Sequence, residues 1–286
     1  MSIIFSPYTI PAGLNEASKF IGGDVRWAYE NSMQEKLLKI YGPTVKEEAG
    51  FIPEIESIAS KDVGEINRFL RERGFNIQLD PIQDPRGFAA AAVLKALLEW
   101  ETKGGKHPLS TPDGKTYPGV LMKKKVSCFG TGTSHHSVIR IPTKSGDLVY
   151  MTVAEKVPAD EFELLDKIRQ LEERVFFRDH VEVLFPMVDL DIQGNLEWLQ
   201  GMWTVSEKDQ PWFISQALRQ TKLRMNEVGV KIEEAIAFSV MRGGPSQTRR
   251  VIINEPFLIW ATRHTLTLPL FAGYVTPEDW KEPAEL

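Results

Sequence analysis

Cysteine is nearly absent from this sequence of 286 residues, and its scarcity sets the first limit. The single cysteine, Cys128, excludes an intramolecular disulfide and a zinc site built from cysteines. The fold must therefore be held together by packing, which suits a reducing compartment. The chain can bury a sizeable hydrophobic core, because 42% of its residues are hydrophobic and 26% are charged, as in an ordinary globular protein.

Long hydrophobic runs and surplus positive charge are missing as well. No apolar run approaches the ~20 residues needed to span a bilayer, and the N-terminal MSIIFSPYTIPAG lacks the basic flank and apolar core of a signal peptide. A formal net charge of -5 argues against a general nucleic-acid-binding surface, which needs a basic face to neutralise phosphates. We expect an intracellular or virion-associated protein with no nucleic-acid partner and no membrane partner.

The hydrophobic pattern predicts a mixed α and β structure. Helical spacing indicates one helix over 15–41 and a second over 61–74, which is closed by its final glycine. The stretch 88–100, FAAAAVLKALLEW, is ambiguous, because its alanines favour a helix whereas a fully buried strand also fits. From Tyr117 onward strands dominate, with one further helix over 159–176.

Cys128 with His135 and His136 is the first candidate for nucleophilic catalysis. A thiol and a base are present, but no third group stands at a recognisable spacing to orient the base. The two histidines are adjacent, so on a strand they point to opposite faces and make a poor metal site. A structural cysteine on a strand and a surface pair of histidines are the better interpretation.

Two short stretches imitate ion-binding loops and fail. DLDIQG, from Asp189, begins like a calcium loop, but Gln200 occupies the position that should carry the bidentate glutamate. KGGKHP, at 103–108, lacks the spacing and the Ser or Thr of a phosphate-binding loop, and we interpret it as a turn. We therefore predict no metal, no cofactor and no enzyme active site.

Eight stretches stand in a fixed order along nearly the whole chain: IIFSPYTIPAGL (3–14), EINRFLRERGFNI (65–77), FAAAAVLKALLEW (88–100), DGKTYPGVLMKKKVSCFG (113–130), VIRIPTKSGDLVYMTVAEKVP (138–158), VEVLFPMVDLDIQGNLEWLQGMW (181–203), ISQALRQTKLRMNEVG (214–229) and INEPFLIWATRHTLTLPLFAGYVTP (253–277). They resemble segments of the serpin family, in the family's own order. The first three resemble the buried strand entering the second helix, the helix that crosses the front of the main sheet, and the central strand that follows. The last two resemble the strand before the reactive loop and the hairpin after it. These two carry the family's signature positions, at Glu227, Gly229, Pro256, Phe257, Phe271 and Gly273.

The resemblance implies an α+β, serpin-like fold in one domain over 1–286, with a large mixed main sheet, smaller sheets and a reduced set of helices. It favours a strand over 88–100. The chain starts where the family's second helix begins, and the stretch before the crossing helix is short. We therefore expect a pared-down serpin fold without the first helix and part of the helical N-terminal region. Small members of this kind fit a viral source.

The resemblance also makes 226–260 a reactive-loop-like segment with its flanking strands. Inhibitory serpins expose this loop as protease bait and then insert the cleaved arm into the main sheet, which requires small, uncharged residues after the signature glycine. Here the arm is VKIEEAIAFSV, and alternation places large apolar side chains on one face, at Val230, Ile232, Ile236, Phe238 and Val240. A mobile loop with such a face would be prone to pairing. We expect Val230 to Val240 to form an ordered strand in the intact protein.

Further departures from the family argue against rapid insertion. Glu234 lies on the apolar face of the arm, where burying its carboxylate without a partner is costly. In the shutter-like region, Arg219 replaces the family's histidine and Lys95 its asparagine, which adds two positive charges to an uncharged hydrogen-bond network. Ser6 is retained there, and Thr9 supplies a second hydroxyl.

The tip, MRGGPSQTRR, is the feature that favours inhibition, although a solvated basic turn also fits. Its candidate scissile region offers a trypsin-like protease several sites, formed by Arg242, Gly243, Gly244, Pro245, Arg249 and Arg250. The sequence as a whole favours a non-inhibitory serpin-fold binding or structural protein. The alternative is a serpin-type protease inhibitor with the Arg242–Gly243 region as bait, and an enzyme is the weakest hypothesis. Either function implies a protein partner, which is a serine or cysteine protease or other subunits of an assembly.

Overall fold

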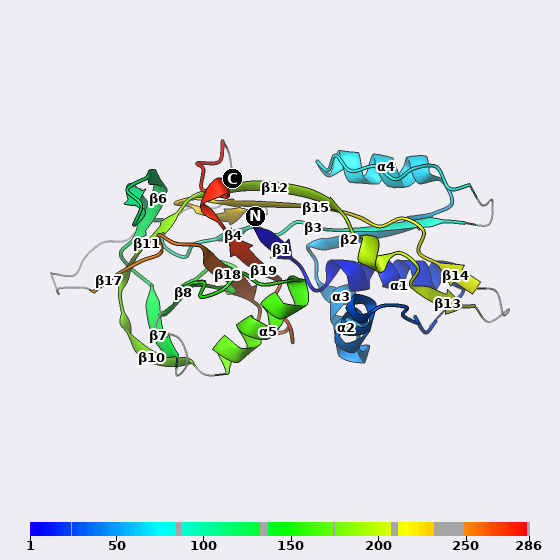
Figure 1. Cartoon of the computed structure of the whole chain (residues 1–286), viewed down its shortest axis with the longest axis horizontal. Coiled ribbons are helices and arrows are strands. Elements are labelled where there is room, and N and C mark those ends of the chain that lie inside the picture. Colours follow the sequence, from blue (N-terminus) through cyan, green and yellow to red (C-terminus); the bar gives the residue numbers. More distant parts are fainter. Residues whose placement is uncertain are drawn as a thin grey trace. The chain divides into compact units, whose positions relative to one another are not determined.

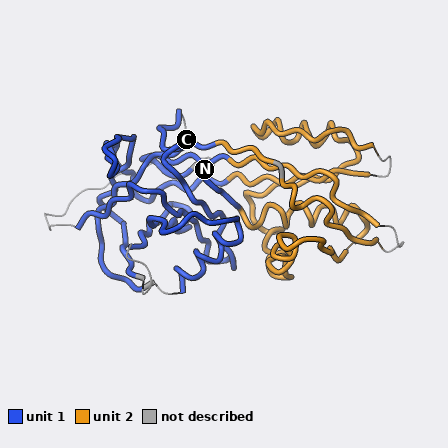
Figure 2. The backbone as a smooth tube through the Cα atoms, in the orientation of Figure 1, with its two compact units in different colours: residues 1–5, 96–190, 222–286 blue, residues 6–95, 191–221 orange. Residues whose placement is uncertain are grey.

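The chain is divided by its internal contacts into two compact units, each assembled from segments that lie far apart in the sequence (Figure 2). The computed structural model describes residues 1–23, 25–83, 87–131, 137–173, 175–206, 211–231 and 249–284. Unit 1 comprises Met1–Phe5, Ala96–Leu190 and Lys222–Leu286, and unit 2 comprises Ser6–Lys95 and Asp191–Thr221. The single domain expected over 1–286 stays a prediction.

A seven-stranded antiparallel sheet forms the core of unit 1. In spatial order its strands are β1 (Ile3–Phe5), β19 (Phe271–Val275), β18 (Phe257–Thr262), β9 (Leu148–Val153), β8 (Val138–Pro142), β7 (Ser127–Thr131) and β10 (Val175–His180). Trp260 of β18 is fully buried and stacks on Tyr150 of β9, with ring centroids 5.2 Å apart. Helix α5 (Glu161–Glu172) begins at Asp160, whose carboxylate accepts hydrogen bonds from the first backbone N–H groups.

A second sheet of unit 1 has the order β17 (Arg250–Ile252), β11 (Glu182–Pro186), β6 (Thr116–Met122) and β5 (Gly105–Ser110). β17 runs parallel to β11, whereas β6 runs antiparallel to both β11 and β5. The short helix η2 (Pro277–Asp279) leads to Trp280, which is buried edge-on against Tyr117 of β6. β5 stands last in the strand order, so it is an edge strand whose outer side has no described strand partner.

The third sheet contains the segment that resembles the loop hinge. Its order is β12 (Val188–Asn195), β15 (Leu218–Met225), β16 (Gly229–Lys231) and β4 (Leu98–Glu99). β12 and β15 are long enough to contribute residues to both units, while β16 and β4 lie wholly in unit 1. β4 follows β3 (Ala89–Leu94) along the chain after a break of a few residues.

Unit 2 holds most of the helices. Its other elements are α1 (Thr9–Ile21), α2 (Ser32–Ile40), α3 (Pro43–Phe51), β2 (Ile55–Ser60), α4 (Val63–Glu72), η1 (Glu197–Leu199) and the hairpin of β13 (Trp203–Val205) and β14 (Pro211–Phe213). α4 packs on the two-stranded sheet of β2 and β3 and buries its apolar stripe there (Figure 1), through Ile66, Phe69 and Leu70. Among the described residues β3 pairs only with β2, so its other edge has no described partner.

Side-chain amides hold the extended segment that follows α4. Asn67 donates to the carbonyl oxygen of Leu79 at 3.0 Å and accepts from its N–H at 2.9 Å. Gln216 does the same with the backbone of Asp80, at 3.1 and 2.9 Å. Each amide therefore satisfies both backbone groups of one residue, which replaces the hydrogen bonds that a neighbouring strand would supply.

Several expectations from the sequence are confirmed and three are wrong, among them the turn over 103–108, which is mostly the edge strand β5. The strand over 88–100 is present as β3 and β4, and the helix that closes on Gly74 is α4. The single helix over 15–41 is wrong: it is two helices, because Gly22 and Gly23 adopt φ of 126° and 143°, which no helix accommodates. The helix over 159–176 ends earlier than expected, since Val175 begins β10.

We predict that Asn67→Ala lowers the free energy of unfolding by about 1–3 kcal/mol, because two backbone groups of Leu79 lose their partners. The amide of Leu79 should also lose protection from hydrogen exchange. Arg68→Ala, at an exposed position on the same helix, is the matched control and should change stability by less than about 0.5 kcal/mol. Unchanged hydrogen exchange at Leu79 in the Asn67 variant would contradict the role given to the two hydrogen bonds of Asn67.

Candidate functional site

The candidate site is the hinge, residues Asn226 to Lys231, which forms the turn from β15 into β16 and the first residues of the arm. Asn226 builds the turn: its side-chain oxygen accepts from Val228 N–H at 2.7 Å, and its own N–H donates to Gly229 O at 3.0 Å. Trp100, directly after β4, holds the turn from outside. Its backbone N–H donates to Val228 O and its indole N–H to Asn226 O, both at 3.0 Å.

β16 is paired on both sides. Against β15, Met225 lies opposite Val230 and Arg224 opposite Lys231; against β4, Leu98 lies opposite Val230. Val230 is 0% exposed. The first apolar residue of the arm is therefore part of the sheet core.

The packing around Gly229 explains why this chain has a glycine at the signature position. A Cβ atom there would lie 2.7 Å from Leu98 O and 2.8 Å from Glu99 Cα, which are backbone atoms of β4. Real Cβ atoms essentially never approach so closely, and backbone atoms of a paired strand cannot swing aside as a side chain can. The close approach of the two backbones thus depends on the missing side chain.

Glu227 ties the hinge to the segment that precedes β5. Its backbone carbonyl accepts from Gly104 N–H at 2.8 Å, and its carboxylate lies 3.8 Å from the ammonium of Lys103. The other carboxylate oxygen, Oε2, is buried without a hydrogen-bond partner among the described residues. The side chain is 13% exposed. The pKa of Lys106 is raised, first by its hydrogen bond to Glu282 and then by the charge of Glu227.

β4 is itself fastened by an ion pair. Glu99 is 7% exposed, and its carboxylate lies 2.6 Å from the ammonium of Lys144. The backbone N–H of Lys144 also donates to Glu99 O at 2.8 Å. Lys144 therefore stabilises β4, the strand against which Gly229 packs.

The structure reaches only part of the predicted loop. Of the expected strand Val230 to Val240, it describes Val230 and Lys231, both within β16, so the rest stays a prediction. The remaining loop residues of interest lie outside the described part of the chain: Ile232, Glu234, Arg242, Gly243, Gly244 and Pro245.

The two arginines at the end of the loop are described. Arg249 is exposed, and its carbonyl accepts from Glu182 N–H at 3.1 Å. Arg250 begins β17 and donates to the carboxylate of Glu182 at 2.8 and 3.1 Å. The chain is therefore back in a sheet by residue 250.

The shutter-like residues lie in unit 2, and the structure brings two of them together. Thr9 Oγ1 donates to Ser6 O at 3.2 Å, while Ser6 Oγ is buried without a hydrogen-bond partner among the described residues. Lys95 is exposed, so its charge stays in solvent. Arg219 is half-buried on β15.

Sequence reasoning gave little weight to Gln220, the residue after Arg219. It is 8% exposed, accepts from Asn76 N–H at 2.6 Å and donates to Asp191 at 2.7 Å. The sequence reasoning also missed the roles of Trp100 and Asn226. An Asx-turn pattern, Asn three residues before Gly, was the one local signal for Asn226. The contacts of Trp100 with Asn226 and of Gln220 with Asn76 join segments more than 100 residues apart.

The catalytic and ion-binding candidates find no support in the described residues. Cys128 is buried in β7, as expected for a structural cysteine, and His135 and His136 lie outside the described part. Asp189 forms an ion pair with Arg224 at 3.2 Å. In the same part of the chain no group of three or more His, Cys, Asp or Glu side chains is placed to hold a metal ion. No helix there is long and apolar enough to cross a membrane.

Solved structures resemble the chain over nearly its whole length. A highly specific serpin of the insect Tenebrio molitor matches with a TM-score of 0.62 and 14% identity, over 96% of this chain and 91% of that chain. Thyroxine-binding globulin in complex with thyroxine matches with 0.60 and 15%, over 98% and 93%. Mouse protein-Z dependent protease inhibitor matches with 0.58 and 15%, over 96% and 90%. No family model and no curated protein sequence matches the chain.

The chain therefore has an α+β serpin fold, as the ordered motifs predicted. Neighbours with this fold include both a protease inhibitor and a thyroxine-binding globulin. At these identities the likeness defines the fold alone, so the function must be argued from the hinge.

We predict that Gly229→Ala lowers the free energy of unfolding by about 1–3 kcal/mol, because the new methyl group meets backbone atoms of β4. Gly50→Ala is the matched control: a Cβ at this position of α3 meets nothing within 4 Å. That variant should gain about 0.5–1 kcal/mol from helix propensity. Opposite signs in urea unfolding are expected, and a Gly229 variant as stable as the wild type would contradict the close approach.

Proposed function

We propose that this protein is a non-inhibitory serpin-fold binding or structural protein whose loop arm is already part of a sheet before any cleavage. The two-sided pairing of Val230 carries the proposal, because the arm enters the sheet at its first apolar residue. The alternating apolar pattern from Val230 to Val240 predicts that the strand continues. An arm that is already paired has little free energy left to release on cleavage.

Two strand edges that have no partner among the described residues support the same proposal. Within the described residues, β3 pairs only with β2, and β15 pairs with β12 and, near its end, with the short β16. Backbone groups along such an edge require hydrogen-bond partners, and natural sheets rarely leave them bare. Glu234 would then stand on the inward face and would require a partner or a proton.

The same edges also favour a second candidate, a serpin-type protease inhibitor. In that case the arm would enter the sheet only after a protease had cut the Arg242–Gly243 region. The large apolar side chains of the arm and Glu234 argue against this order of events, because both slow insertion between strands. Arg250 is a poor bait, since its backbone is held in β17.

A protein partner is part of either proposal. For a binding or structural protein, the partner is another subunit of an assembly, and an intracellular or virion-associated site of action follows from the composition. For an inhibitor, the partner is a serine or cysteine protease. Incubation with a panel of such proteases separates the two, because an SDS-resistant complex forms only with an inhibitor that traps the acyl-enzyme.

We predict that cleavage at the loop tip leaves the melting temperature within a few degrees of its original value. A strand added on cleavage would contribute a large increment against the ~5–15 kcal/mol that holds most domains, and would raise the melting temperature by roughly 10 °C or more. The measurement is a thermal melt before and after limited trypsin treatment, with Arg242→Ala as the control for the cleavage site. A rise of tens of degrees in the cleaved protein would favour the inhibitor.

A further inference from the structure

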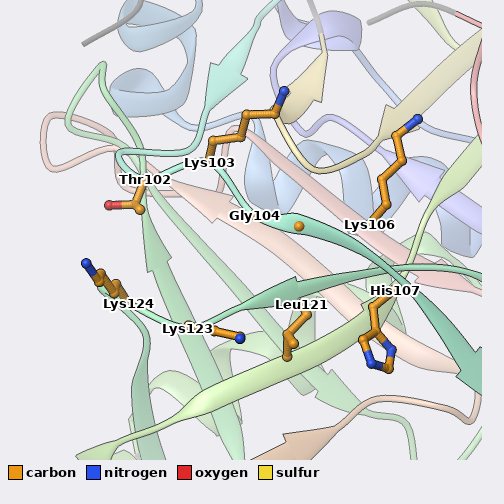
Figure 3. Close-up of a pocket in the computed structure, with 9 residues that line it drawn as sticks. Thr102, Lys103, Gly104, Lys106, His107, Leu121, Lys123 and Lys124 are labelled. Carbon is orange, nitrogen blue, oxygen red and sulfur yellow. The ribbon is translucent and has the colours of Figure 1, made fainter. Parts of the chain in front are cut away.

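The shallow basic pocket at the start of β5 has lysines that diverge from one another (Figure 3). Its volume is about 490 Å³. Lys103 and Lys106 leave one side of the backbone, whereas Lys123 lies on the other side and Lys124 points away from it. Lys103 and Lys106 are each paired with a carboxylate as well. These side chains therefore share no common point at which a ligand could be held.

The hairpin of β13 and β14 in unit 2 (Figure 1) carries large apolar side chains on its solvent-exposed face. In its register Trp203 lies opposite Phe213, and Val205 lies opposite Pro211. All four side chains are exposed, and Phe213 is 69% exposed. Thr204, which points to the other face, is 0% exposed. An antiparallel sheet ordinarily turns its apolar face to the core and its polar face to water, so the pattern here is reversed.

The inner face of the hairpin packs on the rest of unit 2. Trp212, opposite Thr204 in the register, packs edge-on against Phe88, with ring centroids 5.4 Å apart. Phe88 in turn stacks on Phe20 of α1. Thr204 Oγ1 donates to the carbonyl oxygen of Arg26 at 2.7 Å. Turning the hairpin over would break these contacts, so within the described part of the chain its outer side chains stay in solvent.

A short segment beside β13 adds two charged side chains to the outer face. Ala28 pairs with Trp203 through two backbone hydrogen bonds, of 2.7 and 3.2 Å, which places its side chain on the same face. Trp27 points inward, since its indole N–H donates to a serine of α1. Arg26 and Glu30, two residues before and two after Ala28, therefore belong to the outer face, and both are exposed.

The two charges stand at opposite ends of the outer face. The carbonyl of Arg26 accepts from Thr204, in the middle of β13. Glu30 lies before the start of β13, because a Cβ on Gly201 would be 3.1 Å from its Oε2. An extended chain advances about 3.3 Å per residue, so four residues separate the two positions by up to about 13 Å along the strand direction. Ala28 lies midway between them.

We propose that this outer face binds the same face of a second copy of the chain, in a dimer with two-fold symmetry. A two-fold axis across the strands, along the row of Ala28, Trp203 and Phe213, reverses the strand direction in the partner. Arg26 then lies opposite the partner's Glu30, and Glu30 opposite the partner's Arg26. Trp203 and Phe213 meet the same residues of the partner, so aromatic rings pack on aromatic rings. The face is therefore complementary to itself, which a face with charges of one sign would not be.

The size of the face sets the strength of the dimer. Its aromatic side chains expose part of the roughly 150–250 Å² that each can bury, so the face amounts to a few hundred Å² per copy. That is comparable to the largest apolar patch of a typical monomer, about 300–600 Å², and smaller than the ~800 Å² per partner of a standard interface. We expect a weak, reversible dimer with a Kd of roughly 10–100 µM.

The dimer deepens the proposed function and rests on it in one respect, since it makes a second copy the other subunit of the assembly. None of the residues of the face belongs to the hinge. Loss of the dimer would leave hydrogen exchange at the hinge and the melt of the cleaved protein unchanged. A large rise in melting temperature on cleavage would likewise leave the dimer unchanged, so the two proposals fail separately.

Sedimentation velocity of the whole protein, over a concentration series from about 1 to about 500 µM, tests the dimer. The wild type should shift from monomer to dimer across the series. Phe213→Ser should weaken self-association at least about tenfold, because an aromatic ring is lost from the axis of the interface. Phe51→Ser, at a similarly exposed phenylalanine of α3, is the matched control and should behave like the wild type. A wild type that stays monomeric, or equal weakening in both variants, would overturn the proposal.

Charge reversal tests the two-fold arrangement. Arg26→Glu and Glu30→Arg should each weaken self-association by about three- to tenfold, because like charges then face each other at both ends of the interface. An equimolar mixture of these two variants should recover the wild-type affinity, since every cation again lies opposite an anion of the other chain. The double variant Arg26→Glu/Glu30→Arg should recover it as well. A mixture that associates no better than either variant alone would overturn the two-fold dimer.

Discussion

The close approach of the β16 backbone at Gly229 to the backbone of β4 is the constraint on which the hinge depends. β16 lies between β15 and β4 only because no side chain stands between Gly229 and the backbone of Leu98 and Glu99. This contact buries Val230 completely. The absence of a side chain at Gly229 thus lets the arm start inside a sheet.

Polar contacts around Gly229 make the arrangement rigid. Asn226 closes the turn, Trp100 accounts for two of its carbonyl groups, and the pair of Glu99 with Lys144 supports β4 from the other side. Glu227 is the weak member, because one of its buried carboxylate oxygens has no described partner. An element held by many good contacts and one poor one is well placed to respond to a change of charge at the poor contact.

Much of the fold was predictable from the sequence, for reasons that differ between elements. α4 was clear because its apolar residues recur at helical spacing and a glycine ends it, whereas the alanine-rich β3 was decided only by its resemblance to serpins. The helix expected over 15–41 failed because Gly22 and Gly23 break it by positive φ, a signal that was present but outweighed. The stretch 103–108, which includes the start of β5, was taken for a turn, since glycines and a proline are typical of turns. Gly104, just before the strand, instead packs closely against Val120 and Met122 of β6.

The site was predictable only in outline. The signature residues Glu227 and Gly229 marked the hinge, but the partners that hold it, Trp100 and Lys144, come from distant segments and follow from no local pattern. Amide hydrogen exchange of the intact, uncleaved protein, resolved to Gly229, Val230 and Lys231, tests the central claim most directly. If the arm is part of the sheet, these amides exchange slowly, on the timescale of the buried strand β18. Exchange at the rate of an exposed loop would contradict the account.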